Sequence, residues 1–113
     1  MAIKEKLDVV LKIKADFLAA LASPVRLAVI EELRGGESSV GRMVERLQVE
    51  QSSLSKHLAI LRHAGIVVSR QHRNTAQYSI RDREIFRILR PIAQILRKRM
   101  DESRAVFARL GRA

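Results

Sequence analysis

Residues 51–65 read QSSLSKHLAILRHAG, and the fold follows from the pattern of this stretch. Leu54, Leu58 and Leu61 recur at i, i+4 and i+7, which predicts a helix with one apolar stripe. The other side of this helix carries small, polar or cationic residues: Ser52, Ser55, Lys56 and Ala59. Short hydroxyls beside a lysine suit the major groove of DNA, because the backbone can come close and the side chains can bond base edges or phosphates. An ordinary amphipathic surface helix would show the same pattern.

The residues before this stretch predict that it is the second half of a helix-turn-helix spanning residues 39–64. Residues 37–39 supply an N-cap for a short helix, whose apolar side is Val40, Met43, Val44 and Leu47. Gly41 inside this helix costs about 1 kcal/mol relative to alanine, which indicates a close packing contact. Residues 48–50 then form a tight turn without the glycine often found there.

The residues after it predict a β-hairpin over residues 66–80. Two short β-branched or alternating segments, residues 66–70 and 76–80, flank a turn at residues 71–75. A hairpin directly after a groove-binding helix is a wing, and its basic tip would reach a neighbouring groove or phosphate.

Two more helices are predicted toward the N-terminus. The first runs from about residue 4 to 21, with an apolar stripe of Ile3, Leu7, Val10, Leu11, Phe17, Leu18 and Leu21. Ser23 and Pro24 begin the second, as an N-cap and a proline at the first helical position. Leu27, Ile30 and Leu33 form its buried face, and residues 35–36, both glycine, end it.

A last helix is predicted from Asp82, which can cap it, with a kink or break near residues 88–91 because of Pro91. Beyond the proline, an apolar stripe continues through Ile92, Leu96, Met100, Ser103, Phe107 and Leu110. So small a chain has little left to cover it. We therefore expect a dimer interface built from residues 1–22 and 82–113, although the two helices could instead pack on each other within one subunit. The expected interface residues are Leu7, Val10, Leu11, Ile92, Leu96, Met100 and Phe107.

Composition indicates one folded domain over residues 1–113, in the cytoplasm. The chain is 47% hydrophobic, which argues against disorder, and it has no cysteine, which excludes disulfides and thiolate metal sites. No apolar run approaches the roughly 18 residues of a membrane span, so no membrane partner is expected. The N-terminus lacks the uninterrupted apolar core of a secretory signal.

The net charge of +10 is unevenly distributed. Residues 1–50 hold eight basic and eight acidic residues, whereas residues 51–81 hold five basic residues, all three histidines and no acid. An acid-free block that begins with the predicted groove helix is expected of a protein that binds a polyanion such as double-stranded DNA.

The order of elements and three motifs resemble the ArsR/SmtB family of winged-helix repressors over roughly residues 14–90. The motifs are residues 17–27 (FLAALASPVRL), residues 49–58 (VEQSSLSKHL) followed by Leu61, Ala64–Gly65 and Val67, and residues 78–80 (YSI). The resemblance implies a mainly α fold with a small β-hairpin and with N- and C-terminal dimerisation helices. It also implies a homodimer that binds an imperfect palindrome, with the recognition helices in successive major grooves.

Carried over by position, the resemblance makes residues of the groove helix and of the wing candidates for DNA contacts. In the helix these are Gln51, Ser52, Ser53, Ser55, Lys56 and His57, and in the wing Arg70, His72, Arg73, Asn74 and Thr75. His57 could reach a phosphate or could lie against its own subunit. Arg73 stands where the family often has glycine, so the turn must use Asn74, which tolerates positive φ, or be longer. Arg73 itself could contact DNA or remain an exposed, mobile side chain.

Neither of two metal sites known in the family has its ligands here. The first site needs cysteines at the start of the third helix, but residues 37–41 read ESSVG. The second site needs histidine in the terminal helix, but the chain has no histidine after Asp82. We expect no metal and no cofactor, and the effector is not evident. No nucleophile–base pair or phosphate-binding glycine loop indicates an enzyme.

The sequence therefore predicts a sequence-specific DNA-binding transcriptional regulator, a homodimeric repressor of a palindromic operator. Two alternatives remain at this point. A non-specific architectural DNA-binding protein would have a similar charge, and a protein-interaction module could use the same fold without DNA, although the acid-free block argues against the latter.

Overall fold

The computed structural model describes residues 3–111, which form two units that divide between Asp82 and Arg83. Residues 1–2 and 112–113, at the ends of the predicted domain, and the side chain of Ile3 in the predicted stripe lie outside the described part. The chain is mainly helical with a small antiparallel sheet, as predicted.

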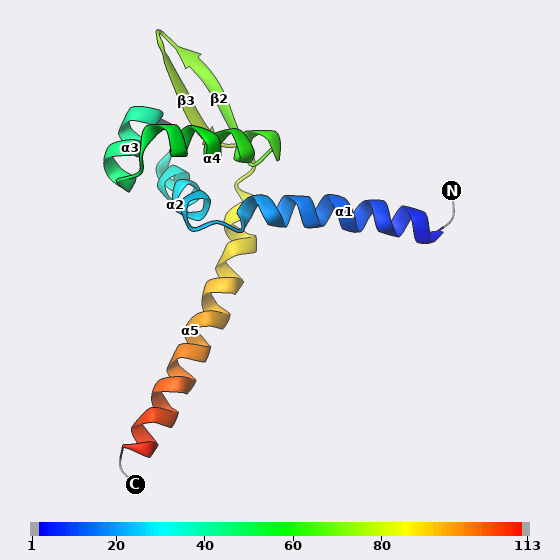
Figure 1. Ribbon diagram of the computed structural model, residues 1–113, viewed down its shortest axis with the longest axis vertical. Coiled ribbons are helices and arrows are strands. Elements are labelled where there is room, and N and C mark those ends of the chain that lie inside the picture. Colours follow the sequence, from blue (N-terminus) through cyan, green and yellow to red (C-terminus); the bar gives the residue numbers. More distant parts are fainter. Residues whose placement is uncertain (1–2, 112–113) are drawn as a thin grey trace. The chain divides into compact units, whose positions relative to one another are not determined.

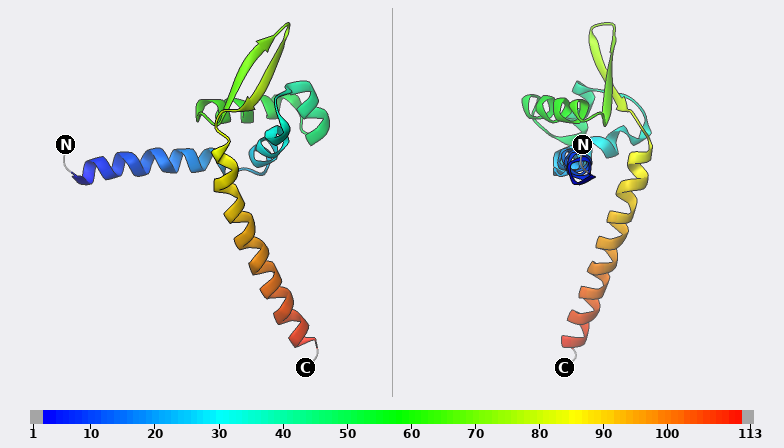
Figure 2. Two further views of the ribbon diagram at one scale, coloured as in Figure 1. Left: turned by 180° about the vertical axis from the view of Figure 1, so that it is seen from behind. Right: turned by 90° about the vertical axis from the view of Figure 1, so that its right-hand side faces the viewer.

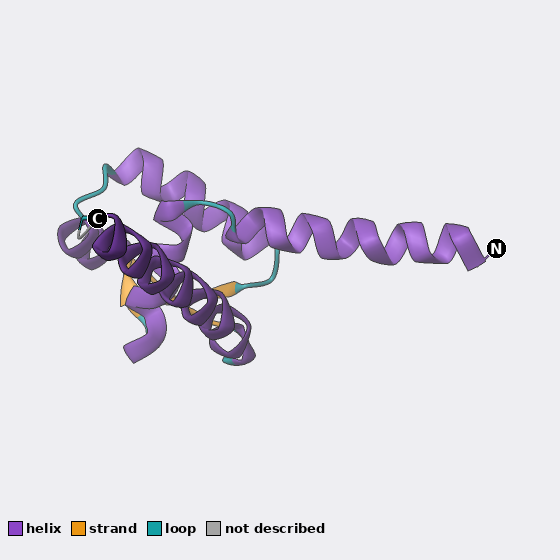
Figure 3. Ribbon diagram, turned by 90° about the horizontal axis from the view of Figure 1, so that it is seen from below, coloured by secondary structure: helices purple, strands orange, loops and turns teal. Residues whose placement is uncertain are grey.

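The helices of the first unit are α1 (Ile3–Leu21), α2 (Pro24–Glu32), the 3₁₀ turn η1 (Leu33–Gly35), α3 (Val40–Leu47) and α4 (Gln51–His63). Helices α2 and α3 begin directly after the predicted capping serines, Ser23 and Ser39. The Ser23 hydroxyl accepts a hydrogen bond from the Arg26 amide at 3.3 Å, and the Ser39 hydroxyl accepts one from the Arg42 amide at 3.2 Å. Both serines thus satisfy donors that a helix start leaves unpaired. In Figures 2 and 3, α1 extends well beyond α2.

The core of the first unit lies where α2, α3 and α4 meet, and aliphatic side chains fill it. Its fully buried members include Val29, Ile30, Leu33, Met43, Leu54, Leu58, Leu61 and Val67. Two predictions were wrong here. Leu27 is 40% exposed, because the buried side of α2 is centred on Val29 and Ile30. Gly41 makes no packing contact, since nothing lies within 4 Å of the position of a Cβ atom there.

The predicted hairpin is present and belongs to a three-stranded sheet. It consists of β2 (Val67–His72) and β3 (Thr75–Ile80), and it extends away from α3 and α4 (Figure 1). A short strand, β1 (Ser38–Ser39), pairs with the other side of β3, which gives the order β1-β3-β2. The sequence analysis did not predict β1.

The turn of the hairpin differs from the prediction. His72 pairs with Thr75, so only Arg73 and Asn74 connect the strands. Arg73 has a φ of 59°, and Asn74 is not among the described residues with positive φ. Both predictions for this turn, a left-handed Asn74 or a longer loop, were therefore wrong, because the arginine itself occupies the left-handed region.

The second unit is one helix, α5 (Glu84–Leu110). Its N-cap position is Arg83 and not Asp82, and the helix continues through Pro91 without the predicted break. Proline leaves the carbonyl of Arg87 without its usual donor, but both residues are exposed, so water can bond that carbonyl. Near the start of the helix Ile85 and Phe86 are buried, and the helix is largely exposed from Arg87 onward.

Candidate nucleic-acid interface

The helix α4 presents the predicted groove residues on its exposed side. Leu54, Leu58 and Leu61 are buried and hold the helix against the core. The exposed members of the predicted set are Gln51, Ser52, Ser55 and Lys56, whereas Ser53 is half-buried. We call Gln51, Ser52, Ser55, Lys56 and Ala59 the recognition face. No side chain of this face itself carries a negative charge, and Lys56 adds a positive one.

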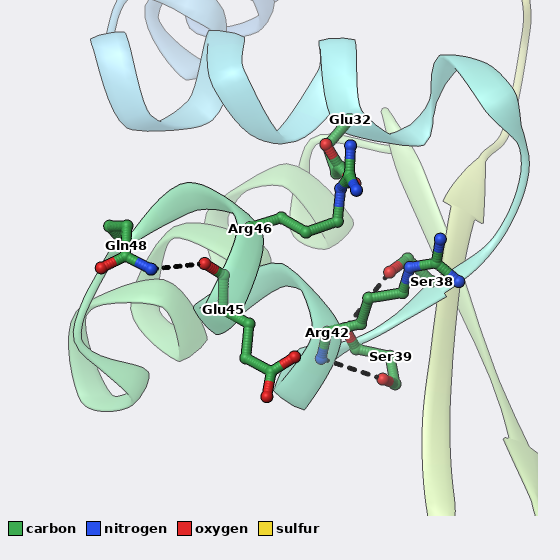
Figure 4. Close-up of polar contacts among 7 residues, drawn as sticks. All are labelled: Glu32, Ser38, Ser39, Arg42, Glu45, Arg46 and Gln48. Atoms are coloured by element: carbon green, nitrogen blue, oxygen red, sulfur yellow. Dashed lines mark hydrogen bonds and ion pairs between the residues drawn. The ribbon is translucent and has the colours of Figure 1, made fainter.

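A left-handed glutamine makes the tight turn between α3 and α4. Gln48 has a φ of 55° and ends α3, with its amide donating to the Val44 carbonyl at 3.0 Å. Its side-chain Nε2 donates to the Glu45 carbonyl at 2.6 Å (Figure 4). These two bonds compensate for the strain of a side chain in this region, which is why the turn needs no glycine.

The first helix of the helix-turn-helix, α3, carries an exposed arginine, Arg42, that the sequence analysis missed. Arg46 forms an ion pair with Glu32 that links α3 to α2, and Arg42 lies exposed in the first turn of α3 (Figure 4). Within the described part of the chain, no ion pair engages the Arg42 guanidinium. The first helix of such motifs crosses the DNA backbone, so a basic residue at its start was the signal that could have identified Arg42.

His57 lies against its own subunit. Its Nδ1 is 3.0 Å from Nη1 of Arg26, which comes from α2, and the ring is half-buried. The sequence left open whether His57 reaches a phosphate or lies against its own subunit. For Nδ1 the structure shows the contact within the subunit. Among the described residues, no hydrogen-bond partner of Nε2 is found.

The wing carries its charges in two different settings. Arg70 on β2 donates two hydrogen bonds to the carboxylate of Glu37, 2.8 Å from Nε to Oε2. The Arg70 guanidinium holds the pKa of Glu37 below its usual range, and Glu37 in turn raises the pKa of Arg70. His72, Arg73, Asn74 and Thr75 are exposed at the tip of the hairpin.

Residues 51–81 include no acidic residue, but acidic residues from outside this block contact it in the folded structure. Glu37 neutralises Arg70 at the base of the wing, and Glu50 accepts a hydrogen bond from the Ser52 hydroxyl at 3.0 Å. Neither carboxylate was predicted to touch the interface. Of the predicted wing residues, Arg73 is the arginine whose charge no described acid offsets.

The predicted dimer residues are exposed apolar side chains on two helices. Leu7, Val10 and Leu11 lie on α1, and the α5 members are Ile92, Leu96, Met100 and Phe107. Their exposed fractions run from 46% to 72%. Such faces are unusual for a chain that stays monomeric.

A groove of about 750 Å³ lies between α1, α2 and the C-terminal half of α4. Its walls include Ile13, Phe17, Arg26, Ile60 and His63. Among residues 3–111, no group of three or more His, Cys, Asp or Glu side chains is arranged to hold a metal ion. No helix in the same range is long and apolar enough to cross a membrane.

Comparison with known proteins finds the same arrangement among transcriptional regulators. A family model described as a helix-turn-helix domain matches residues 21–70. The HTH-type transcriptional regulator Rv0081 of Mycobacterium tuberculosis is 34% identical over 97 residues, 85% of each chain. Its crystal structure, matched over 82% of this chain and 94% of that one, has a TM-score of 0.74 at 33% identity.

Two further relatives are similar over most of this chain. The crystal structure of NolR from Sinorhizobium fredii has a TM-score of 0.72 at 30% identity and covers 84% of this chain and 93% of that chain. The HTH-type transcriptional repressor SmtB of M. tuberculosis is 34% identical over 71% of this chain and 59% of its own length. A homodimeric winged helix-turn-helix domain from Mycobacterium bovis, with a TM-score of 0.76 at 20% identity over 90% of this chain and 93% of that one, shares the fold.

Proposed function

The chain belongs to the ArsR/SmtB family of winged helix-turn-helix transcriptional regulators, and from this premise we propose that it is a homodimeric repressor of a palindromic DNA operator. In this proposal residues 39–64 read the major groove and residues 66–80 form the wing. Residues 1–22 and 82–113 provide the dimer contacts, and the protein works in the cytoplasm.

The observation that carries the proposal is the recognition face of α4. Gln51 and Ser55 have side chains that bond base edges, and Lys56 suits a phosphate. Three buried leucines fix the rotation of the helix, so these side chains must point outward together. The wing tip, with Arg73, supplies a further phosphate or minor-groove contact.

The exposed apolar faces of α1 and α5 support dimerisation. A second copy would cover them, and two-fold symmetry would then require an operator with two related half-sites. We expect the half-site centres to lie one helical turn apart, roughly 34–36 Å.

The test is a genome-wide map of binding sites, followed by affinity measurements on the recovered sequence. We expect a palindromic site, and an affinity that falls by orders of magnitude from low to moderate salt if each subunit neutralises about three to five phosphates. An affinity for DNA that does not change with salt concentration would contradict the phosphate contacts.

Competition by bulk DNA separates the repressor from an architectural DNA-binding protein. For a sequence-specific repressor, unlabelled mixed-sequence DNA should displace the labelled operator only at an excess of roughly a thousandfold or more. Displacement at equal concentration would support the architectural alternative.

A further inference from the structure

The side chain of Arg26 joins the end of α1 to α4. Its Nε donates to the Ala20 carbonyl at 2.6 Å and its Nη2 to the Ala19 carbonyl at 3.2 Å. These carbonyls belong to the last turn of α1, where the usual helical donors run out, and the Ala19 carbonyl also accepts from the Ala22 amide at 3.1 Å. The third nitrogen, Nη1, lies 3.0 Å from Nδ1 of His57. One guanidinium therefore caps α1 and also contacts the middle of α4.

This contact determines where the imidazole carries its proton. A guanidinium has only N–H donors and stays charged, so Nδ1 of His57 must accept. A histidine that accepts through Nδ1 is neutral and holds its proton on Nε2.

The Nε2–H group is available to a ligand. In the described part of the chain, no buried side-chain nitrogen or oxygen lacks a hydrogen-bond partner. Since no described residue bonds Nε2, this atom is not fully buried. At 3.6 residues per turn, His57 lies at the flank of α4, between the buried leucines and the exposed Lys56.

We propose that Arg26 is a positioning residue for DNA binding: it holds His57 as the neutral Nε2–H imidazole, and that N–H donates to a DNA phosphate. This inference rests on the proposed function, because it places a phosphate beside α4. It assigns Arg26, a residue outside the helix-turn-helix, a role in DNA affinity.

The first experiment reads the tautomer directly, without DNA. Nitrogen-15 NMR of histidine-labelled full-length protein at mildly alkaline pH should show His57 as the Nε2–H tautomer. His63 and His72, both exposed, serve as internal references. Arg26→Met should allow the Nδ1–H form to appear at His57, whereas Arg34→Met, which removes an arginine paired elsewhere with Glu31, should not. An Nδ1–H tautomer in the wild type would overturn the proposal.

The second experiment measures affinity for a mixed-sequence duplex of about 30 base pairs across a range of salt concentrations. His57→Ala should weaken binding roughly tenfold or more at every salt concentration, with an unchanged salt slope, because a neutral donor releases no counterion. Lys56→Ala, one residue away, should lower the slope by about one per subunit. Unchanged affinity in His57→Ala, or a slope that falls as it does in Lys56→Ala, would overturn the proposal.

A double-mutant comparison ties the two residues together. Arg26→Met should weaken binding, by no more than His57→Ala does, and should add no more than Arg34→Met does when His57 is already alanine. Circular dichroism checks that each variant is folded. If Arg26→Met does not fold, the wild-type tautomer and the His57→Ala slope decide alone. A wild-type protein that binds no DNA would overturn the proposed function as well. If the wild type binds DNA and His57→Ala binds with unchanged affinity, only the role of His57 and Arg26 is overturned.

Discussion

Gln51 and Ser55 are the residues that we expect to separate the operator from other DNA. Both are exposed on the recognition face, where their side chains can bond base edges. Gln51→Ala or Ser55→Ala should lower the ratio of operator to mixed-sequence affinity by about tenfold, since a good base contact contributes about 1–3 kcal/mol of discrimination. Fluorescence anisotropy with both DNAs measures this ratio.

Arg73→Ala is the matched comparison from the wing. A phosphate contact carries no sequence information, so this variant should weaken both affinities by a similar factor. An equal loss of specificity at all three positions would refute the division of roles between helix and wing.

The pair of Glu37 and Arg70 makes stability depend on pH. Arg70 holds the pKa of Glu37 below its usual value, so the folded state binds this proton less readily than the unfolded state. The pair therefore stabilises the protein above the unfolded pKa, and this contribution is lost as pH falls through the folded pKa. Glu37→Gln should lose less stability than the wild type between about pH 5 and pH 3, as followed by urea unfolding. Glu45→Gln, which changes an exposed residue of α3, is the control. Parallel stability curves for wild type and Glu37→Gln would exclude the effect.

At the scale of elements, the turn between α3 and α4 depends on one left-handed residue. Gln48→Val should destabilise the protein by about 1–2 kcal/mol, because a β-branched side chain clashes in that conformation. Gln48→Gly should be tolerated, since glycine adopts positive φ freely and this offsets the lost bond to Glu45. Urea unfolding of the two variants checks the difference, and an equal loss in both would show that the side-chain bond, not the backbone, dominates.

Elements with a strong local pattern could be predicted from the sequence, and contacts between distant residues could not. The leucine repeat of α4 and the caps Ser23 and Ser39 are local signals, and each appears in the structure. The strand β1 has two residues, too few to show alternation. The left-handed conformation of Arg73 follows from the register of β2 and β3, which is a property of the paired strands.

The same distinction applies to the candidate site. The exposed side of α4 follows from helical periodicity, so its residues were found. Arg26 meets His57 across 31 positions and Arg70 meets Glu37 across 33, and neither separation leaves a pattern in the chain. These contacts arise only when the elements pack, and they change the role expected of each residue.

At the scale of the whole molecule, the apolar face of α5 should control oligomeric state. Leu96 is 54% exposed, and a carboxylate there would have to be buried in a dimer. We expect Leu96→Glu to shift the protein from dimer to monomer in sedimentation velocity and to weaken operator binding by at least tenfold. Gln94→Glu adds the same charge on the opposite side of α5, about 160° around the helix from Leu96, and should remain dimeric. A dimeric Leu96→Glu would exclude this face from the interface.

The two-residue turn of the wing makes the hairpin adjustable in length. The strands pair continuously from Val67–Ile80 to His72–Thr75, so residues can be added on both sides of Arg73–Asn74 without disturbing the pairs below. Two added residues per strand lengthen the wing by about 7 Å and keep the alternation of faces, whereas one per strand exchanges the inner and outer sides of everything beyond it. The length of the wing can therefore be changed in steps of two residues per strand. Such variants would change how far the tip of the wing extends from α4.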